Sequence, residues 1–351
     1  MQKLTKIQIL KINKYITDEA KKQRIPGIAI GIYKHGKIVF SKGYGVGRLN
    51  SKFKINPRTI FCLGSIGKQF ISAAIMILVE EHKISVEDRL FDYFPNSPKS
   101  WKLIKIKHML SHTSGIGEYQ NDYGDADSEF NGPKSLFYSQ RNFSEDELAK
   151  RSQRLRLNFK PGEKWAYCNT NYMLLGIIIH KITGMFWLDY LKLRIFRPYG
   201  MKSVRLVYRK NIKSDIPLGY HIKNGKLKKV VWWSDTFNSV ADGTFYCNVL
   251  DLAKWDNVLY CNKLLSKTSL KRIWTVFKLN DGKPNRDNYG FGWEINMLDG
   301  HKVIEHNGNW QGFNAHIARY IDDKITVVVL ANLLEAKTTQ MSHDIAKMLI
   351  I

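Results

Sequence analysis

Strand-like segments lie near both ends of the chain, and a long, mainly helical stretch separates them. Two β-rich runs, residues 28–33 and 37–41, are joined by His35-Gly36, which is a hairpin signal. Residues 85–284 have mainly helical patterns. The β-like runs then return at 289–295, 302–305, 316–320 and 325–331. Because one sheet would need strands from both groups, the order predicts an antiparallel sheet built from both chain ends, with a mainly helical lobe inserted.

We therefore expect a single unit of the α+β class, with helices flanking the sheet. Its α/β lobe would comprise residues 1–64 plus 285–351, and its helical lobe residues 65–284. Apolar residues at helical spacing predict a helix over 5–23, and residues 69–82 are apolar on most faces, which predicts a buried helix. No Pro- or Gly-rich linker divides the chain into two independent domains.

The net charge is strongly positive, with 55 Lys and Arg against 31 Asp and Glu, or +24 at pH 7. Such a field favours acidic partners, including nucleic acid, anionic lipid and polyanionic wall polymers. The basic residues are scattered along the whole chain, however, whereas a nucleic-acid binder is expected to cluster them. We therefore expect a solvated basic surface and no nucleic-acid partner.

Apolar residues make up 44% of the chain, enough to bury a sizeable core, which argues against disorder. The longest apolar stretches, such as 173–179 and 325–330, are far below the roughly 20 residues that a membrane span needs. We expect no membrane span.

The cysteines and the N-terminal residues indicate which cellular compartment to expect. The chain has four cysteines: Cys62, Cys168, Cys247 and Cys261. They form no C-x-x-C pair and no zinc-binding spacing, so the fold is not expected to depend on disulfides. Lysines interrupt residues 1–11 too often for the apolar core of a signal peptide. The sequence as written predicts a cytoplasmic protein, and an exported one if a signal has been trimmed.

Ser65 and Lys68 form an S-x-x-K motif immediately before the predicted buried helix. Residues three apart on a helical turn share one face, so the lysine can lower the proton affinity of the serine hydroxyl or accept its proton. A second S-x-x-K copy, Ser51 to Lys54, lies in a polar stretch with no buried helix behind it. Context therefore favours Ser65 as a nucleophile.

Two weaker motifs accompany this serine. Y-x-N occurs four times, beginning at Tyr119, Tyr167, Tyr246 and Tyr260. Only Tyr167 lies between a Pro-Gly turn and a helix start, a loop position where functional groups concentrate. His306-Asn307-Gly308 is the only H-x-G, and it follows the predicted strand 302–305. Its glycine would allow a ligand or backbone to approach closely.

These motifs are accompanied by several longer segments: 61–65, 108–115, 251–255, 289–293 and 327–332. In this order, over about residues 26–333, the chain resembles the serine β-lactamase and penicillin-binding-protein superfamily. With Y-x-N and H-x-G as second and third motifs, it is most similar to the class C β-lactamase-like branch. That branch includes D-alanyl-D-alanine carboxypeptidases, D-amino-acid peptidases and esterases. The resemblance implies a β-lactamase/transpeptidase-like fold.

The resemblance also implies a role for each motif residue. Ser65 would be the acylated nucleophile, Lys68 its activating partner, and Tyr167 the general base, as phenolate or through a shared proton. Asn169 would hold the substrate amide. His306 would assist proton transfer or anchor a substrate carboxylate, and Gly308 and Asn309 would contact the substrate. The oxyanion hole would pair the N–H of Ser65 with that of Asn309.

The expected function is that of a serine hydrolase acting on an ester, amide or peptide, with a small-molecule or peptide substrate. The third motif of this chain is H-x-G, whereas K-T-G is the form with a lysine, so the site lacks a permanently charged side chain at this place. The alternative is a catalytically weak penicillin-binding-like scaffold that acts as a binding or assembly module. Loops 116–140 and 209–244 are expected to line the cleft, and Asp242 and Asp251 to cap helices.

No cofactor is expected. His108 and His112 are four residues apart, but no H-E-x-x-H pattern or third ligand accompanies them, so no metal site is expected either.

Overall fold

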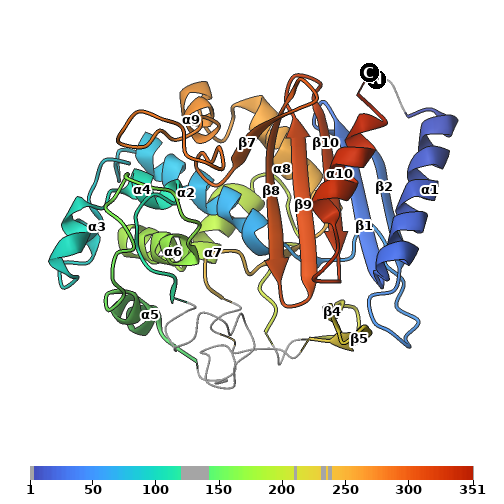
Figure 1. Cartoon of the computed structure of the whole chain (residues 1–351), viewed down its shortest axis with the longest axis horizontal. Coiled ribbons are helices and arrows are strands. Elements are labelled where there is room, and N and C mark those ends of the chain that lie inside the picture. Colours follow the sequence, from blue (N-terminus) through green and yellow to red (C-terminus); the bar gives the residue numbers. More distant parts are fainter. Residues whose placement is uncertain (1–3, 120–141, 209–211, 231–234, 236–238, 351) are drawn as a thin grey trace.

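A six-stranded antiparallel sheet occupies one half of the molecule in Figure 1. The computed structural model describes residues 4–119, 142–208, 212–230, 235 and 239–350. In spatial order the strands are β2 (Lys37–Gly45), β1 (Gly27–Lys34), β10 (Ile325–Ala331), β9 (Phe313–Tyr320), β8 (His301–Trp310) and β7 (Glu294–Leu298). Strand β1 pairs with β10 in the register Ile28 to Ala331, which joins the two ends of the chain. The predicted fold class is confirmed.

Helices α1 (Lys6–Gln23) and α10 (Thr338–Lys347) cover one face of the sheet (Figure 1). Thr5 caps α1, accepting from the Gln8 N–H while the Gln8 side chain accepts from the Thr5 N–H. Alternate residues of the central strands form a hydrophobic cluster with these helices, and the intervening residues join a larger cluster on the opposite face. Along β8, for example, Val303 belongs to the first cluster and Ile304 to the second.

The opposite face packs on the helical lobe. Its helical elements are η1 (Gly64–Gly67), α2 (Lys68–Glu80), α3 (Leu90–Tyr93), η2 (Lys99–Leu103), α4 (Ile106–Leu110), α5 (Glu145–Ser152), α6 (Asn169–Thr183), α7 (Trp187–Leu191), η4 (Lys192–Phe196), α8 (Val249–Cys261) and α9 (Lys267–Ile273). Helix α2 is buried on nearly all sides, as its apolar sequence predicts. It begins at Lys68 of the S-x-x-K motif, directly after η1, which holds Ser65, and so positions that turn beside the sheet.

Short strands also occur within the helical stretch. Strands β3 (Phe61–Cys62) and β6 (Tyr246–Cys247) pair beside the serine turn. Strands β4 (Tyr220–Lys223) and β5 (Lys226–Lys229) form a hairpin whose turn, Asn224-Gly225, has positive φ at both residues. This hairpin was expected to be loop, because its lysine-rich strands are too polar to show a buried face.

Two strand predictions near the C-terminal end are wrong in extent. The run predicted at 289–295 becomes β7 only from Glu294, because Gly292 has φ +75° and interrupts extended backbone. Strand β8 does not stop at Glu305 but continues to Trp310, because Asn307 and Gly308 pair with residues of β9. His306 therefore lies inside a strand rather than after one.

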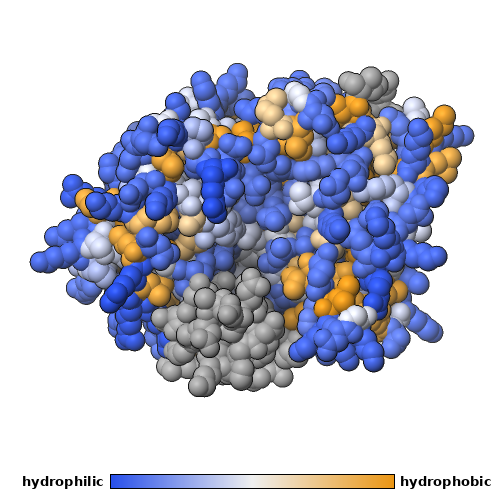
Figure 2. Space-filling model, in the orientation of Figure 1, coloured by the Kyte–Doolittle hydropathy of each residue, from blue (hydrophilic) through white to orange (hydrophobic). Residues whose placement is uncertain are grey.

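Much of the two predicted cleft loops, namely residues 120–140, 209–211, 231–234 and 236–238, lies outside the described residues. Among the helices that are described, none is by itself long and apolar enough to cross a bilayer. Only α6 taken together with Trp187–Phe196 reaches that length and composition, and this pair is bent by 73°. Figure 2 shows hydrophilic side chains over most of the face drawn, in keeping with the high charge.

Candidate active site

Ser65 lies in the short helical turn η1, half-buried, where the chain enters α2. Two glycines, Gly308 and Gly243, let neighbouring backbone approach this turn. A Cβ on Gly308 of β8 would lie 1.9 Å from the Leu63 carbonyl oxygen and 3.0 Å from the Ser65 nitrogen. A Cβ on Gly243 would lie 2.3 Å from the Gly64 oxygen. Only glycine fits at these contacts, so the serine turn is held between β8 and the segment before β6.

Lys68, the first residue of α2, is fully buried and directs its amino group at Ser65. Its Nζ lies 3.0 Å from Ser65 Oγ and 2.8 Å from Asn169 Oδ1, and it also donates to the backbone carbonyl of Asp242. The amide oxygen and the carbonyl can only accept, so they take two N–H groups of the amine. The third position of the nitrogen faces the serine hydroxyl.

Burial lowers the pKa of Lys68 to about 8, against a usual value of 10.5. Desolvation disfavours the ammonium form, and the negative charges of Asp242 and Glu118 offset only part of this effect. An appreciable fraction of the amine is consequently neutral near neutral pH. A neutral Lys68 can accept the Ser65 proton at the nitrogen position that faces the hydroxyl.

Tyr167 precedes α6 by two residues and stacks its ring on His112, with ring centroids 4.2 Å apart at an angle of 32°. Tyr167 is 37% exposed, and its hydroxyl interacts with the Ser65 side chain. The Lys68 Nζ lies 5.0 Å from the ring centroid. Burial raises the pKa of the Tyr167 phenol well above 10, and the bond to Ser65 offsets this only in part. The phenol is therefore neutral at pH 7, which favours the shared-proton alternative over the phenolate.

Asn169 is the first residue of α6 and links this helix to the lysine. Its side-chain oxygen accepts from Lys68, and its backbone N–H donates to the Glu118 carboxylate at 2.6 Å. A carboxylate at this position is stabilised by the exposed N–H groups and the dipole of the helix N-terminus. Asn169, Asn309 and Ser65 line a cavity of about 50 Å³ together with Gly64, Asp242, Gly243, Thr244 and Trp310. The two backbone N–H groups expected to form the oxyanion hole belong to residues of this one cavity.

His306 lies on the face of β8 that is turned toward the serine, and it is fully buried. Its Nδ1 is 2.5 Å from the Asn307 carbonyl oxygen and must donate there, which leaves Nε2 to accept from the Tyr289 hydroxyl at 2.8 Å. Burial, together with the nearby charge of Lys68, lowers the pKa of His306 to about 3, although the hydrogen bond to the Asn307 carbonyl opposes the shift. The ring is neutral at pH 7, so the carboxylate-anchoring alternative lacks its cation.

The structure adds residues that the sequence reasoning missed. Asp242 was expected to cap a helix, but its buried carboxylate accepts from the Tyr119 hydroxyl at 2.7 Å beside Lys68. Burial raises the pKa of this carboxyl, and the charge of Lys68 opposes the shift. His112 supports Tyr167, and Tyr289 supports His306. No spacing in the sequence links these residues to Ser65, because tertiary packing alone brings them together.

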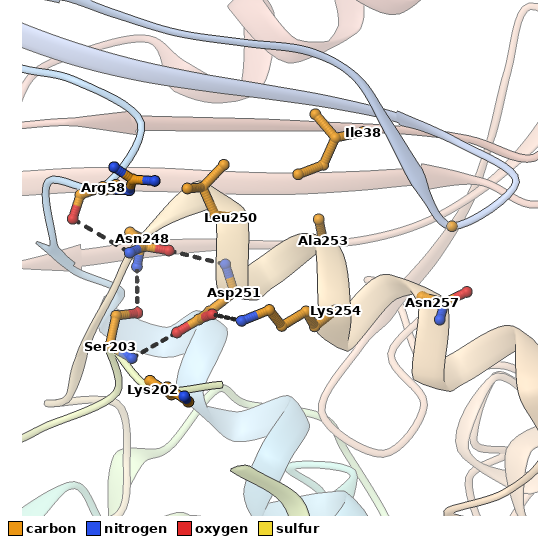
Figure 3. Close-up of a pocket in the computed structure, with 11 residues that line it drawn as sticks. Ile38, Arg58, Lys202, Ser203, Asn248, Leu250, Asp251, Ala253, Lys254 and Asn257 are labelled. Atoms are coloured by element: carbon orange, nitrogen blue, oxygen red, sulfur yellow. Dashed lines mark hydrogen bonds and ion pairs between the residues drawn. The ribbon is translucent and has the colours of Figure 1, made fainter. Parts of the chain in front are cut away.

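A larger cavity, about 650 Å³, lies at the start of α8 and shares no lining residue with the serine cavity. Asp251 was also expected to be a cap, but the cap of α8 is Asn248, whose side chain accepts from the Asp251 N–H (Figure 3). The Asp251 carboxylate instead accepts from the Ser203 N–H and pairs with Lys254 at 2.6 Å. Asp251 and Lys254 pair with each other, whereas Arg58 and Lys202 leave the lining with a net positive charge, and no nucleophile in the lining is paired with a base.

Comparisons with known proteins bear on the family and the fold. The Beta-lactamase family model matches residues 12–348. Penicillin-binding protein 4* of Bacillus subtilis (strain 168) is 28% identical over 310 residues, or 85% of this chain and 66% of that protein, so the chain spans just under two thirds of this relative's length. The octameric penicillin-binding protein homologue from Pyrococcus abyssi superposes with a TM-score of 0.82 at 28% identity, covering 97% of this chain and 77% of that one.

D-amino acid amidase from Ochrobactrum anthropi SV3, complexed with L-phenylalanine, gives a TM-score of 0.81, with 97% of this chain and 98% of that chain covered. At 18% identity this likeness shows the fold alone. The fold is thus common to proteins described as penicillin-binding proteins and as amidases.

Proposed function

Because the chain belongs to the beta-lactamase family, we propose that it is a serine hydrolase that forms an acyl-enzyme on Ser65 and releases the acyl group with water. The observation that carries this proposal is the buried amino group of Lys68, 3.0 Å from Ser65 Oγ, with its pKa lowered to about 8 by burial. A serine hydroxyl is a weak nucleophile until an adjacent base takes its proton. Lys68 is that base.

The acylation step follows from these contacts. Neutral Lys68 takes the proton of Ser65 as Oγ attacks the carbonyl carbon of the substrate, and the carbonyl oxygen becomes an oxyanion. The N–H groups of Ser65 and Asn309 stabilise that oxyanion, a contribution of about 10²–10³ in rate for each donor in comparable sites. When the intermediate collapses, the leaving group departs with a proton that Lys68 returns through the Tyr167 hydroxyl. Ser65 is then acylated, and Tyr167 regains its proton from Lys68.

Deacylation repeats these steps with water as the nucleophile. Lys68, again neutral, receives a proton of the water through Tyr167, and the water oxygen attacks the acyl carbon. The Ser65–acyl bond breaks, and Ser65 Oγ takes the proton back. Tyr167 is thus a proton relay between neutral states, which suits a phenol whose pKa burial holds well above 10. His306 acts as a positioning residue, because its ring holds the Tyr289 hydroxyl behind Tyr167.

We propose an ester, amide or peptide as the substrate class. The relatives described as penicillin-binding proteins support an amide, since penicillin is a cyclic amide. The neutral His306 argues against a substrate carboxylate bound at that ring, because a neutral imidazole cannot neutralise an anion. The +24 charge of the chain favours the approach of anionic substrates from a distance.

Intact-protein mass spectrometry tests the proposal. The chain is incubated with a fluorophosphonate and, separately, with a labelled penicillin, and Ser65→Ala is treated in parallel. We expect one fluorophosphonate adduct per chain that Ser65→Ala does not form. A penicillin adduct on Ser65 would point to peptidoglycan-type substrates, and fluorophosphonate labelling alone to an esterase or amidase. Absence of both adducts, or equal labelling of Ser65→Ala, would contradict the proposed nucleophile and favour a binding module on the same scaffold.

A further inference from the structure

Two histidines and a glutamate meet on the face of the sheet that is turned away from Ser65. Glu305 lies on β8, His316 on β9 and His343 on α10, and one donor atom from each lies within 4.8 Å of the other two. Glu305 and His316 are fully buried, whereas the His343 side chain is 16% exposed. The neighbouring apolar residues belong to the cluster between the sheet and α10. None of these three residues takes part in the proposed hydrolysis.

Hydrogen bonds to neighbouring groups determine which nitrogen of His316 faces the glutamate. Ser342 Oγ donates to the Thr339 carbonyl at 2.8 Å, so it must accept from His316 Nδ1, 2.6 Å away. The proton of a neutral His316 is therefore on Nδ1. Its Nε2 then presents a lone pair to Glu305 Oε2 at 3.4 Å. Two acceptors that face each other in a buried site repel unless a cation or a proton lies between them.

The carboxylate of Glu305 is oriented in the same way. Asn296 donates its side-chain N–H to Glu305 Oε1 at 2.9 Å, which leaves Oε2 turned to both histidines. Metal-binding sites use such outer contacts to fix the tautomer of a histidine and the orientation of a carboxylate. Glu294 lies directly opposite Glu305 across the β7–β8 pair and adds a second carboxylate to the surroundings.

We propose that Glu305, His316 and His343 form a binding site for a divalent transition-metal ion such as Zn²⁺. Two imidazoles and one carboxylate are a common ligand set for these ions and leave a position open for water. With metal–ligand bonds of about 2.0–2.2 Å, tetrahedral ligands lie roughly 3.4 Å apart, which is the separation of His316 Nε2 and Glu305 Oε2. His343 Nε2 is 2.5 Å from the same oxygen, and the ion would replace the hydrogen that they share.

His343 must therefore move by about 1 Å to join the ion. It is the ligand best able to do so, because it is the most exposed of the three and lies on α10 rather than in the sheet. Its exposed edge also offers the ion a path of entry from solvent. The bound ion would tie α10 to two strands of the sheet. The sequence pattern predicted no such site, because the ligands lie on three separate elements without motif spacing.

Calorimetric titration of the full chain with ZnCl₂, after treatment with EDTA and dialysis, tests this site. We expect one ion per chain and an affinity that falls by at least about 100-fold in His343→Ala, since loss of an outer contact alone costs 10–100-fold. His301→Ala is the matched control. His301 also contacts a carboxylate, Asp323 at 2.9 Å, but lies outside the cluster. Its removal should leave the affinity unchanged.

Two further measurements separate this site from weak binding at other histidines. Zn²⁺ should raise the melting temperature of the wild type and of His301→Ala but not of His343→Ala. Co²⁺ should give a visible absorption band of a low-coordinate histidine site in the wild type, and Glu305→Gln should weaken it. Failure of the wild type to bind one ion, or equal affinity of wild type and His343→Ala, would show that the three residues form only a hydrogen-bonded ionic cluster. Neither result depends on hydrolase activity.

Discussion

At the scale of single residues, Lys68 combines two properties that seldom occur together, full burial and a direct hydrogen bond to a serine. An ammonium group there would be stabilised by the Asp242 and Asn169 oxygens but poorly solvated. The balance places its pKa at about 8, inside the range where small changes of pH alter its charge. In the proposed mechanism, burial of this single amine is what activates the serine of the S-x-x-K turn.

The pKa of Lys68 predicts the pH dependence of acylation. Because the neutral amine is the active form, the rate of fluorophosphonate labelling should rise about tenfold per pH unit below pH 8 and level off above it. Intact-mass measurements of the labelling rate between pH 6 and 9 would check this. Lys68→Arg should label slowly at every pH, since a guanidinium stays charged. A flat profile for the wild type would assign the base role to another group.

At the scale of elements, the serine turn, β8 and the segment before β6 are in backbone contact through Gly64, Gly308 and Gly243. A side chain on any of these glycines would push the serine turn away from β8 or from the segment before β6. Gly308 and Asn309 lie in the part of β8 that is next to the serine turn. The position of this strand therefore sets the position of the proposed oxyanion hole. The geometry of the site therefore depends on strand packing as much as on the catalytic side chains.

Gly308→Ala should displace β8 from the serine turn, because its Cβ would lie 1.9 Å from the Leu63 oxygen. We expect a loss of stability of about 1–3 kcal/mol and a severe loss of fluorophosphonate labelling. Urea unfolding and intact mass would measure the two effects. Gly184→Ala is the control: its φ is +70° but no atom lies within 4 Å, so it should cost about 1 kcal/mol and leave labelling unchanged. Normal labelling of Gly308→Ala would refute the packing argument.

Elements with a strong local signal were predicted well. The apolar run of β10, the hairpin turn at His35-Gly36 and the amphipathic helix α1 all match the sequence prediction, because short-range contacts determine them. The polar β4–β5 hairpin was missed, although its Asn224-Gly225 turn is a strong hairpin signal that the lysine-rich strands obscured.

The candidate site was likewise predicted only in part. The motif residues Ser65, Lys68, Tyr167 and Asn169 converge in space as the family resemblance implied, but their roles remain proposals. Asp242, His112 and Tyr289 could not be found, because long-range packing brings them to the site from segments far apart in the sequence. The protonation states of Tyr167 and His306 likewise follow from burial, which spacing does not reveal.

At the scale of the whole molecule, the sheet and the helical lobe share one hydrophobic core. The larger cluster includes strand residues such as Ile317 and helix residues such as Leu174. A fully buried ion pair also joins the two parts, Arg319 of β9 to Asp256 of α8 at 2.7 Å. The Arg319 guanidinium packs between aromatic rings, lying 4.7 Å from the centre of the Tyr260 ring. Neither part can unfold without exposing the core of the other.

We therefore expect the two lobes to unfold in a single transition. Urea titrations followed by tryptophan fluorescence and by far-ultraviolet circular dichroism should coincide. Trp255 lies on α8 and Trp293 beside β7, so fluorescence reports on both lobes. Asp256→Ala, which leaves a buried guanidinium without its partner, should lower the stability by about 3–5 kcal/mol while keeping one transition. Two separated transitions would show that the lobes are independent domains.

The pairing of β1 with β10 has a consequence for how the chain matures during synthesis. Roughly 290 residues separate Lys34 from Ile325, so the first hairpin has no neighbour on its β10 side until those residues have left the ribosome. At 5–20 residues per second this wait lasts about 15 to 60 s. During that time an apolar strand edge is open to other nascent chains. The yield of active protein should therefore depend on chaperones that shield this edge until the last strands arrive.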